Sequence, residues 1–371
     1  MRRVHPSLDP AKRVPEIIDL MVGEFKQTLV DPATADRSLW KRYHELRRVR
    51  QQELRPEDPV VPDDLEEQVM KREDPFRIQH RYEVSNDGVM LSWLYSELVR
   101  PGTPEWDSNK QFFEADIYVR PDRRGQGIGA SWFPLINQLM ERHGCTILSL
   151  YTEAGVGHEF LKWLGADEKL SEIENRLNLA ELDWAMVERW ASDGPARSPH
   201  TKLEIYDANL PESMWEDFAP QYSALINTIP FEQLEHGDII VTPDQMREYF
   251  ARQEIRGEVQ HTVLAREPDG SISGITDVIW APYRPAVVHQ QLTGVRPDAR
   301  GRGLGKWIKA AMLLRLRELR PDVQWIATEN AGSNEPMLAI NHKLGFKQHR
   351  VGTSYQMTRE RLETRLKELS N

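Results

Sequence analysis

The sequence has only one cysteine, Cys145, among its 371 residues, so the chain can form no intrachain disulfide. Nothing in it points to an oxidising compartment. The sequence also lacks an excess of basic residues, because 48 Lys and Arg stand against 58 Asp and Glu and give a formal net charge of −10. A general nucleic-acid-binding protein would normally present a basic face, so we expect no nucleic-acid partner. A cationic small substrate, such as an amine, is compatible with this charge.

Long apolar runs are missing as well. None approaches the roughly 20 residues that a membrane-spanning helix needs, so we expect no membrane partner. The first ten residues, MRRVHPSLDP, have no apolar core behind their charges and do not resemble a signal peptide. These absences together predict a soluble protein of the cytoplasm.

What the sequence does contain is one eleven-residue segment twice. Residues 119–129 are VRPDRRGQGIG and residues 295–305 are VRPDARGRGLG, so eight of the eleven positions are identical. The second copy follows the first by 176 residues, and the pair Thr-Glu recurs at the same spacing, at 152–153 and 328–329. A repeat of about 20–50 residues would indicate a solenoid, whereas a period this long indicates a duplication of a whole domain.

The two predicted domains, residues 1–192 and 200–371, show the same order of elements. In each, two strand-like runs flank a turn, Asn86-Asp87-Gly88 or Pro268-Asp269-Gly270, and so predict a β-hairpin. Each hairpin leads to a strand that ends in the repeated segment and is followed by an amphipathic helix, which predicts an α+β fold. Four further segments are predicted from composition and periodicity: a loose arm or edge strand over residues 1–15, a helix over residues 16–30, a linker over residues 191–199 and an added surface helix over residues 359–369.

The repeated segment has the chemistry of a phosphate site. In the second copy Gly301, Gly303 and Gly305 alternate with other residues where a strand turns into a helix. Glycine has no Cβ, so a ligand can lie close to successive backbone N–H groups. The first N–H groups of a helix have no intrahelical acceptor, and the positive end of the helix dipole attracts phosphate. The segment therefore predicts a pyrophosphate cradle.

Two other phosphate-binding loops do not fit the spacing. A P-loop needs four residues between its first glycine and Gly-Lys, and then Ser or Thr. Here Gly301 to Gly305 leaves three, and Trp307 follows Lys306, which argues against a nucleoside triphosphatase. The dinucleotide-binding fingerprint G-x-G-x-x-G is one residue longer than the G-x-G-x-G of this chain.

The segment does resemble the acyl-CoA signature of the GNAT superfamily of N-acetyltransferases, R/Q-x-x-G-x-G/A. Arg300, Gly303 and Gly305 fill this pattern, and the preceding V-x-P, formed by Val295 and Pro297, also matches. The resemblance implies two tandem GNAT-like domains, each a mixed, mostly antiparallel sheet with a splayed central strand pair flanked by helices. Tandem relatives include mycothiol-synthase-like enzymes, although nothing in this sequence indicates mycothiol chemistry.

The resemblance also implies a reaction, in which an amine attacks the thioester of an acyl-CoA directly. Acetyl-CoA is the default donor, and a small molecule with a primary amine is the default acceptor. The chain would act as a monomer, a pseudo-dimer of its two halves, or as a homodimer. The residues assigned to the donor lie in the two repeats and before the penultimate helix: Val295, Arg300, Gly301, Arg302, Gly303, Leu304, Gly305, Lys306 and Asn334 in the second copy, and Val119, Arg124, Gly125, Gln126, Gly127, Ile128 and Gly129 in the first.

The base that the reaction needs is sought before the V-x-P motif. In many GNAT enzymes a Glu four or six residues before the valine has this role, and the positions are Gln291 and His289 in the second copy. Histidine titrates near neutral pH, so His289 is our candidate, with a hydrogen-bonded strand histidine as the plain alternative. If His289 lies behind the sheet, Gln291 holding a water, or Glu329, becomes the candidate. The first copy has Ala115 and Phe113 instead, and neither can titrate.

The acid is harder to find. In the family it is a Tyr five residues before the Phe of an L-G-F motif, and that position holds Asn341 here. The first copy has Leu161 at the corresponding point. Tyr355, on the last predicted strand, is a candidate acid, with core packing as its plain alternative, and bulk water could also protonate the leaving thiolate.

These comparisons favour the second copy as the catalytic half and a first copy that keeps the fold. Glu232, Glu235 and Asp238 could form an acidic lip over the acceptor, although a solvated helix face explains them nearly as well. Two rival functions stay open. The missing tyrosines suggest a non-catalytic acyl-CoA-binding or sensing protein, and an acyl-CoA decarboxylase on the same fold would need no amine pocket.

Overall fold

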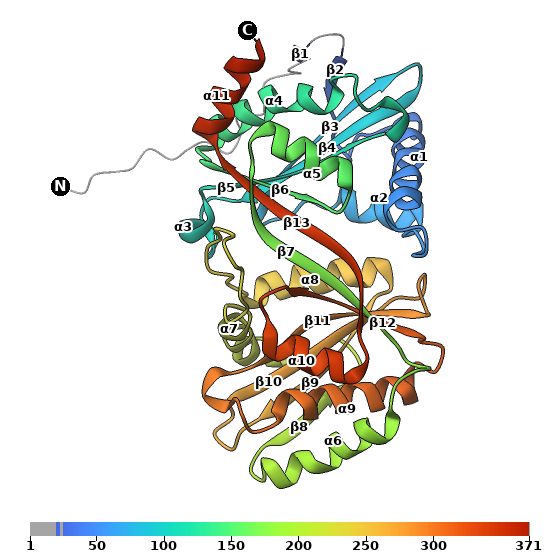
Figure 1. Cartoon of the computed structure of the whole chain (residues 1–371), viewed down its shortest axis with the longest axis vertical. Helices are drawn as coiled ribbons and strands as arrows, with labels where there is room; N and C mark the ends of the chain where they lie inside the picture. The colour runs from blue at the N-terminus through green and yellow to red at the C-terminus, as the bar shows by residue number, and fades with distance from the viewer. Residues whose placement is uncertain (1–19, 23–24, 371) are drawn as a thin grey trace, which may run out of the picture.

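In the computed structural model, which describes residues 20–22 and 25–370, thirteen strands form one sheet and the helices cover both of its faces (Figure 1). The strands are β1 (Leu20–Val22), β2 (Phe25–Leu29), β3 (Arg77–Asn86), β4 (Val89–Val99), β5 (Phe112–Val119), β6 (Ile147–Thr152), β7 (Asp167–Asn178), β8 (Lys202–Tyr206), β9 (Val259–Arg266), β10 (Ile272–Trp280), β11 (Val287–Val295), β12 (Trp325–Ala331) and β13 (Lys347–Thr358).

The α-helices are α1 (Arg37–Leu54), α2 (Asp63–Lys71), α3 (Trp106–Asn109), α4 (Ile128–His143), α5 (Gly155–Leu164), α6 (Trp184–Arg197), α7 (Trp215–Ile226), α8 (Pro243–Arg256), α9 (Leu304–Leu319), α10 (Glu335–Leu344) and α11 (Arg359–Ser370). Short 3₁₀ turns lie at η1 (Pro121–Arg123), η2 (Glu212–Met214) and η3 (Pro297–Ala299). The predicted α+β fold with two similar halves is confirmed.

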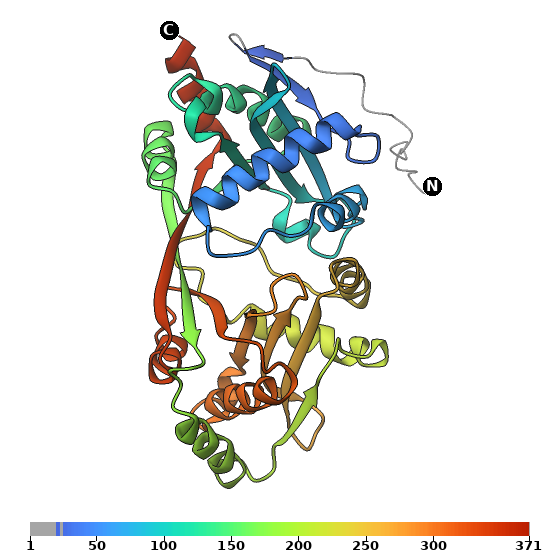
Figure 2. The same cartoon turned by 90° about the vertical axis from the view of Figure 1, so that its right-hand side faces the viewer.

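The two halves exchange their last strands. The strand order is β1-β2-β3-β4-β5-β6-β13-β7-β12-β11-β10-β9-β8, so β13 pairs with β6 and β7 pairs with β12. The two exchanged strands also pair with each other, antiparallel, at the centre of the molecule. Figures 1 and 2 show β13 (red) rising into the N-terminal half while β7 (green) descends into the C-terminal half. Below, the N-terminal half is β1–β6 with β13, and the C-terminal half is β8–β12 with β7.

The exchange places residues in the core of the other half of the chain. Tyr355 and Met357, on β13, are buried in the N-terminal core with Trp132 of α4. Leu177, on β7, is buried in the C-terminal core. Burying one such side chain stabilises a fold by roughly 1.5–3 kcal/mol, so each half depends on the other for part of its apolar burial.

Helices pack on both faces of the sheet in each half. In the C-terminal half α9 buries Ile308 against Val288 on one face, while α7 and α8 cover the opposite face around Leu292. In the N-terminal half α4 covers one face and α1 covers the other through Leu46. The functional site described below lies between α7 and the strands.

Two predictions about single elements were wrong or partly wrong, and a third cannot be compared with the structure. A helix was predicted over residues 16–30, but residues 25–29 form β2, whose Gln27 is buried and donates a hydrogen bond of 2.5 Å to the carbonyl of Ser131. The arm predicted over residues 1–15 lies outside the described residues. The helix over 359–369 is present as α11, but it is not merely a surface helix, because Leu362 is fully buried in the N-terminal core.

The linker predicted over residues 191–199 is mostly the end of α6. Asp183 caps this helix by accepting a hydrogen bond of 3.0 Å from the backbone N–H of Met186. Gly194, which suggested a flexible linker, lets α6 approach α9 closely, because a Cβ there would lie 2.2 Å from the ring of Trp307. Loop-like composition here reflects close helix packing.

None of the helices among the described residues combines the length and the apolar character that a membrane-spanning segment requires.

Candidate active site

The central strand pair of the C-terminal half separates midway along its length. β11 and β12 pair in parallel, and their last pair is Gln290 with Thr328. The ladder between β11 and β10 shifts by one residue between the pairs Val278–Gln290 and Thr276–Thr293. β11 therefore has a bulge after Gln290, which bends the strand and changes the face to which its later side chains point. The splayed strand pair expected from the family resemblance is present here.

The second repeat forms a tight turn before α9. Gly301 and Gly303 have φ of 81° and 84°, a left-handed conformation that favours glycine. The amide of Trp307 donates to the carbonyl of Gly303 at 3.1 Å. In this fully described stretch, the backbone N–H groups of residues 301–306 have no backbone acceptor. Unpaired donors at the positive end of a helix are the geometry that an anion-binding cradle requires.

The first repeat has nearly the same backbone. Gly125 and Gly127 have φ of 74° and 84°, and α4 begins at Ile128. Arg124 donates to the carbonyl of Val119 at 3.1 Å, as Arg300 does to that of Val295 at 3.2 Å in the second repeat. Both cradles are therefore built alike.

The strands beside the two cradles differ. β5 pairs with β4 without a bulge, whereas β11 has one. The Thr-Glu pairs are also out of register: Glu329 is the fifth residue of β12, while the fifth residue of β6 is Tyr151 rather than Glu153. The N-terminal half therefore lacks both the bulge and a carboxylate at the position of Glu329.

Two cavities of the C-terminal half meet at the splayed strands. The first, about 270 Å³, lies between these strands, α7 and β7, and it is the one that we call the acceptor cavity. The second, about 150 Å³, extends toward α10 and is lined there by Asn334 and Met337; we call it the donor cavity. Both are lined by the same central residues: Ile229, Gln290, Gln291, Leu292, Thr328 and Glu329.

Three of the four predicted catalytic residues lie together. His289, Gln291 and Glu329 all line the acceptor cavity, and Asn334 lines the adjoining donor cavity. His289 therefore lies on the cavity side of β11, while its neighbour Val288 packs toward α9. The structure thus brings three of the predicted positions into one cavity.

Tyr355 does not join them. It lies on β13, which the strand exchange carries into the N-terminal half, and it is fully buried there. Its hydroxyl lies 3.0 Å from Nδ1 of His158, on α5. Tyr355 lines neither cavity, so the geometry does not support it as the acid of this site.

The acceptor cavity is acidic. Glu329 of β12 stands directly opposite Glu174 of β7, and both line the cavity. Burial raises the pKa of Glu329, and the neighbouring carboxylates of Glu172 and Glu174 raise it further, while Arg55 acts in the opposite direction. Glu174 was not predicted, since it reaches the site only through the exchanged strand.

A buried lysine that the sequence analysis missed lies behind the splay. Nζ of Lys309, on α9, donates hydrogen bonds of 2.8 Å to Oε1 of Gln290 and to Oδ1 of Asn341. Among the described residues no carboxylate forms an ion pair with it, and burial lowers the pKa of Lys309 to about 7. The sequence held a signal, because this lysine interrupts the apolar face of α9 between Gly305 and Leu313.

A buried aspartate, Asp277, was also not predicted from the sequence. Asp277 of β10 lies opposite the bulge, is 1% exposed, and accepts a hydrogen bond of 2.6 Å from Nε2 of Gln260. Burial raises the pKa of Asp277 to about 7, against the hydrogen bond from the backbone of Leu292. Its carboxyl also raises the pKa of Tyr222, whose ring lines the acceptor cavity and whose pKa rises mainly by burial. The sequence contained a signal for this residue, because an aspartate inside an apolar strand is costly to bury and so indicates a site of interest.

The predicted acidic lip is not formed as expected. Residues 231–241 lie in a loop rather than on a helix face. The carboxylate of Glu232 accepts hydrogen bonds from the backbone N–H groups of Ser333, at 3.1 Å, and Ser171, at 3.3 Å. Glu232 therefore fastens the loop to β7 and to the turn that follows β12. The carboxylates at the acceptor cavity are Glu174 and Glu329 instead.

Solved structures share this architecture. A tandem GNAT protein from the clavulanic acid biosynthesis pathway superposes with a TM-score of 0.69 at 20% identity, over 91% of this chain and 99% of that one. A GCN5-related N-acetyltransferase from Sphaerobacter thermophilus superposes with a TM-score of 0.58 at 13% identity, over 90% and 96%. A GCN5-related glucosamine N-acetyltransferase region of a fungal multi-domain GH3 β-N-acetylglucosaminidase superposes with a TM-score of 0.60 at 12% identity, over 91% of this chain and 38% of that one.

These likenesses establish the fold, since the identities are low. The chain has the tandem GNAT fold, in which two GNAT domains follow one another. Comparison of the sequence with protein-family models and with curated proteins gives no match.

Proposed function

We propose that the protein is an acyl-CoA-dependent N-acyltransferase whose reaction takes place in the C-terminal half. Acetyl-CoA is the default donor, and a primary amine of a small molecule is the acceptor. The observation that supports this most strongly is the meeting of the donor and acceptor cavities at Gln291 and Glu329, where the strands splay.

The donor fits the residues that surround its proposed path. The unpaired N–H groups of residues 301–306 suit the pyrophosphate, because each can donate to a phosphate oxygen without losing a backbone partner. Beyond Gln290 β11 no longer pairs with β12, so its backbone is available to an extended pantetheine arm. Asn334, at the start of α10, lines the donor cavity into which that arm would lead.

The acceptor cavity suits a cation. Glu329 forms no ion pair among the described residues, whereas Glu174 opposite it is already paired with Arg176 at 2.6 Å. A positively charged amine beside Glu329 would therefore gain an unpaired carboxylate. An ammonium is not a nucleophile, so a base must remove its proton before attack. We assign this step to His289, which lines the same cavity.

The proposed reaction then follows from the arrangement. The bound donor supplies a thioester. His289 takes one proton from the ammonium, and the nitrogen lone pair forms a bond to the thioester carbonyl carbon. The carbon–sulfur bond breaks and the thiolate leaves with the electron pair. The nitrogen loses its second proton to solvent, the thiolate takes a proton from solvent, and the amide remains. Gln291 lies between the two cavities and can hold the reacting groups or a water in place.

The test is thiol release from acetyl-CoA with a panel of small primary amines. The proposal expects release that depends on the amine and an acetylated product of matching mass. Tight binding of acetyl-CoA without release for any amine would instead favour an acyl-CoA-binding protein. Carbon dioxide release from malonyl-CoA without an amine would favour a decarboxylase.

A further inference from the structure

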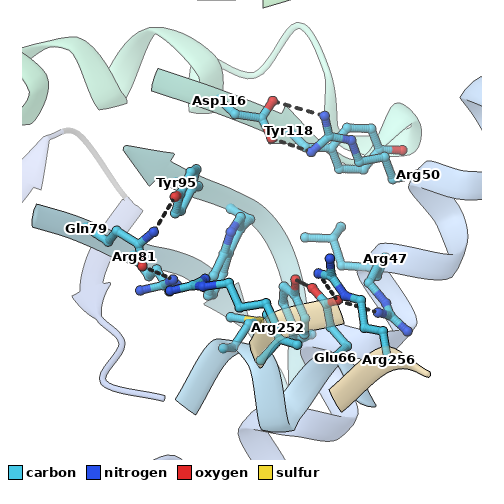
Figure 3. A pocket seen from close by; sticks show the side chains of 15 residues that line it. Arg47, Arg50, Glu66, Gln79, Arg81, Tyr95, Asp116, Tyr118, Arg252 and Arg256 are labelled. Carbon is cyan, nitrogen blue, oxygen red and sulfur yellow. Dashed lines mark hydrogen bonds and ion pairs between the residues drawn. The ribbon is translucent and has the colours of Figure 1, made fainter. Parts of the chain in front are cut away.

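Another cavity, separate from the donor and acceptor cavities, lies in the N-terminal half. Its volume is about 290 Å³, and it lies between α1, α2 and strands β3 to β5, with α8 of the C-terminal half closing one side (Figure 3). Five arginines line it, against two carboxylates, Glu66 and Asp116. We call it the arginine cavity; its arginines are Arg47, Arg50, Arg81, Arg252 and Arg256.

Both carboxylates are already neutralised by the protein. Asp116 forms a two-point ion pair with Arg50, with N–O distances of 2.5 and 3.0 Å. Glu66 accepts a hydrogen bond of 3.2 Å from the hydroxyl of Tyr43 and lies within 4 Å of Arg47 and Arg256. Arg47 also pairs with Asp63, and Arg252 pairs with Glu248 and Asp74, outside the cavity lining.

Arg81 is the cation left over. It donates a hydrogen bond of 2.7 Å to Oε1 of Gln79, and its guanidinium lies 5.3 Å from the centre of the Tyr95 ring. Among the described residues no carboxylate lies within ion-pair distance of Arg81. Burial lowers the pKa of Arg81, and the guanidinium of Arg252 lowers it further. Figure 3 shows Arg81 and Arg252 entering the cavity from the sheet and from α8.

Two further donors in the cavity have no acceptor. Nε of Arg47 and Nε of Arg256 are buried without a hydrogen-bond partner. A buried N–H that loses water without gaining an acceptor costs roughly 1–3 kcal/mol. An oxyanion in the cavity would balance the charge of Arg81.

The walls add an apolar component. Trp93 and Tyr43 pack with ring centroids 4.8 Å apart, and both line the cavity together with Tyr95 and Tyr118. Aromatic walls next to arginines suit a ligand with a flat apolar body and a charged end.

We propose that the arginine cavity binds a small organic anion, with a carboxylate or phosphate held by the arginines and a flat apolar body against Trp93 and the tyrosines. Planar guanidinium groups bind either oxyanion in a two-point geometry.

This site is opposite in charge to the acceptor cavity. Asp116 and Leu292 occupy equivalent positions, each three residues before the valine of its V-R-P-D motif. Asp116 lies among the arginines of the arginine cavity, whereas Leu292 packs in an apolar core. Duplication has thus produced one half suited to an ammonium and one suited to an anion. Because Arg252 and Arg256 come from the other half, the bound anion would also join the two halves.

The experiment is calorimetric titration of the full chain with phenylacetate and phenyl phosphate, with 2-phenylethanol as the neutral control. We expect saturable binding of one ligand per chain for at least one anion, with a Kd between about 1 µM and 1 mM. The neutral alcohol should not bind, and affinity should fall as salt is raised. The tighter of the two probes identifies the oxyanion that the site prefers.

Arg81→Met should weaken binding at least about tenfold. It breaks no ion pair among the described residues, so folding should be retained, and Arg256→Met provides a second variant if it is not. Arg142→Met, at an exposed position of α4, carries the same change in charge and should bind as the wild type. Absence of binding of both anions at about 10 mM, or unchanged binding by both cavity variants, would overturn the proposal. Neither result bears on acyl transfer, which uses the other cavities.

Discussion

Nζ of Lys309 donates a 2.8 Å hydrogen bond to Oδ1 of Asn341, which is itself fully buried. Asn341 occupies the position at which the family resemblance expects a tyrosine. The hydrogen-bond chain continues from the Asn341 side chain, whose Nδ2 donates to Oδ1 of Asn330 at 2.9 Å. Asn330 lines the donor cavity. In place of a phenol, this chain has a buried amine bonded to two amides at the point where the strands separate.

Lys309 predicts a pH-dependent stability. Its folded pKa, about 7, is below the ordinary value of 10.5, so between these values the unfolded chain holds a proton that the folded chain has released. The stability that Lys309 contributes therefore rises with pH across this window. Relative to Lys309→Met, the wild type should gain up to about 2.5 kcal/mol in free energy of unfolding from pH 6.5 to pH 9.

Urea unfolding at the two pH values measures this difference, and Lys343→Met, at an exposed position of α10, is the control that should show no such trend. A difference between wild type and Lys309→Met that stays constant with pH would contradict the prediction.

The two cradles allow a matched pair of variants. Gly303→Asp should abolish acetyl-CoA binding to the C-terminal half, and turnover with it. The new carboxylate would lie next to the negatively charged pyrophosphate and repel it. Gly127→Asp should leave turnover largely intact. Both glycines have φ of 84°, so the backbone strain of the substitution is matched. The surroundings differ, because a Cβ at Gly303 would lie 3.1 Å from the guanidinium of Arg197 whereas one at Gly127 would meet nothing within 4 Å. Calorimetry and thiol release measure the outcome, and the reverse pattern would place the reaction in the N-terminal half.

His289→Gln tests the base. Glutamine keeps a hydrogen-bonding side chain of similar length but cannot accept a proton near pH 7. Removal of a general base typically lowers the rate 10²–10⁴-fold, so kcat should fall by about that factor while acetyl-CoA affinity is unchanged. The acid limb of the pH–rate profile should also disappear.

Glu329→Gln tests whether Glu329, rather than His289, is the general base. If this variant loses the acid limb and His289→Gln keeps it, Glu329 is the base and our assignment is wrong.

Gly194→Ala tests the packing of α6 on α9. Replacing glycine with alanine inside a helix normally stabilises it by up to about 1 kcal/mol. Here the new methyl group would lie 2.2 Å from the Trp307 ring, so we expect a loss of about 1–3 kcal/mol instead. Thermal unfolding checks the sign. Gly155→Ala, at the start of α5 with nothing within 4 Å of its Cβ, should be neutral or stabilising.

Local features of the site could be predicted from sequence because they depend on nearby residues. The cradle follows from glycines at 301 and 303 before an amphipathic helix, since positive φ and unpaired helix amides are local properties. The repeat of that segment gave the two halves directly. His289 and Gln291 were predicted from the positions that the family resemblance implies before the V-x-P motif, and even spacing along a strand keeps both on one face. The bulge after Gln290 was not foreseen in this strand.

Partners far apart in the chain were decided only by the tertiary structure. A strand's own sequence does not state which neighbour it will pair with, and β7 and β13 each pair with the other half. That exchange moved Tyr355 out of the proposed site and brought Glu174 into it. The arginine cavity likewise needs α8 from the second half to meet β3 from the first. The sequence alone determined the repeated backbone geometry, because it is local; the strand exchange and the charge of each cavity required long-range pairing.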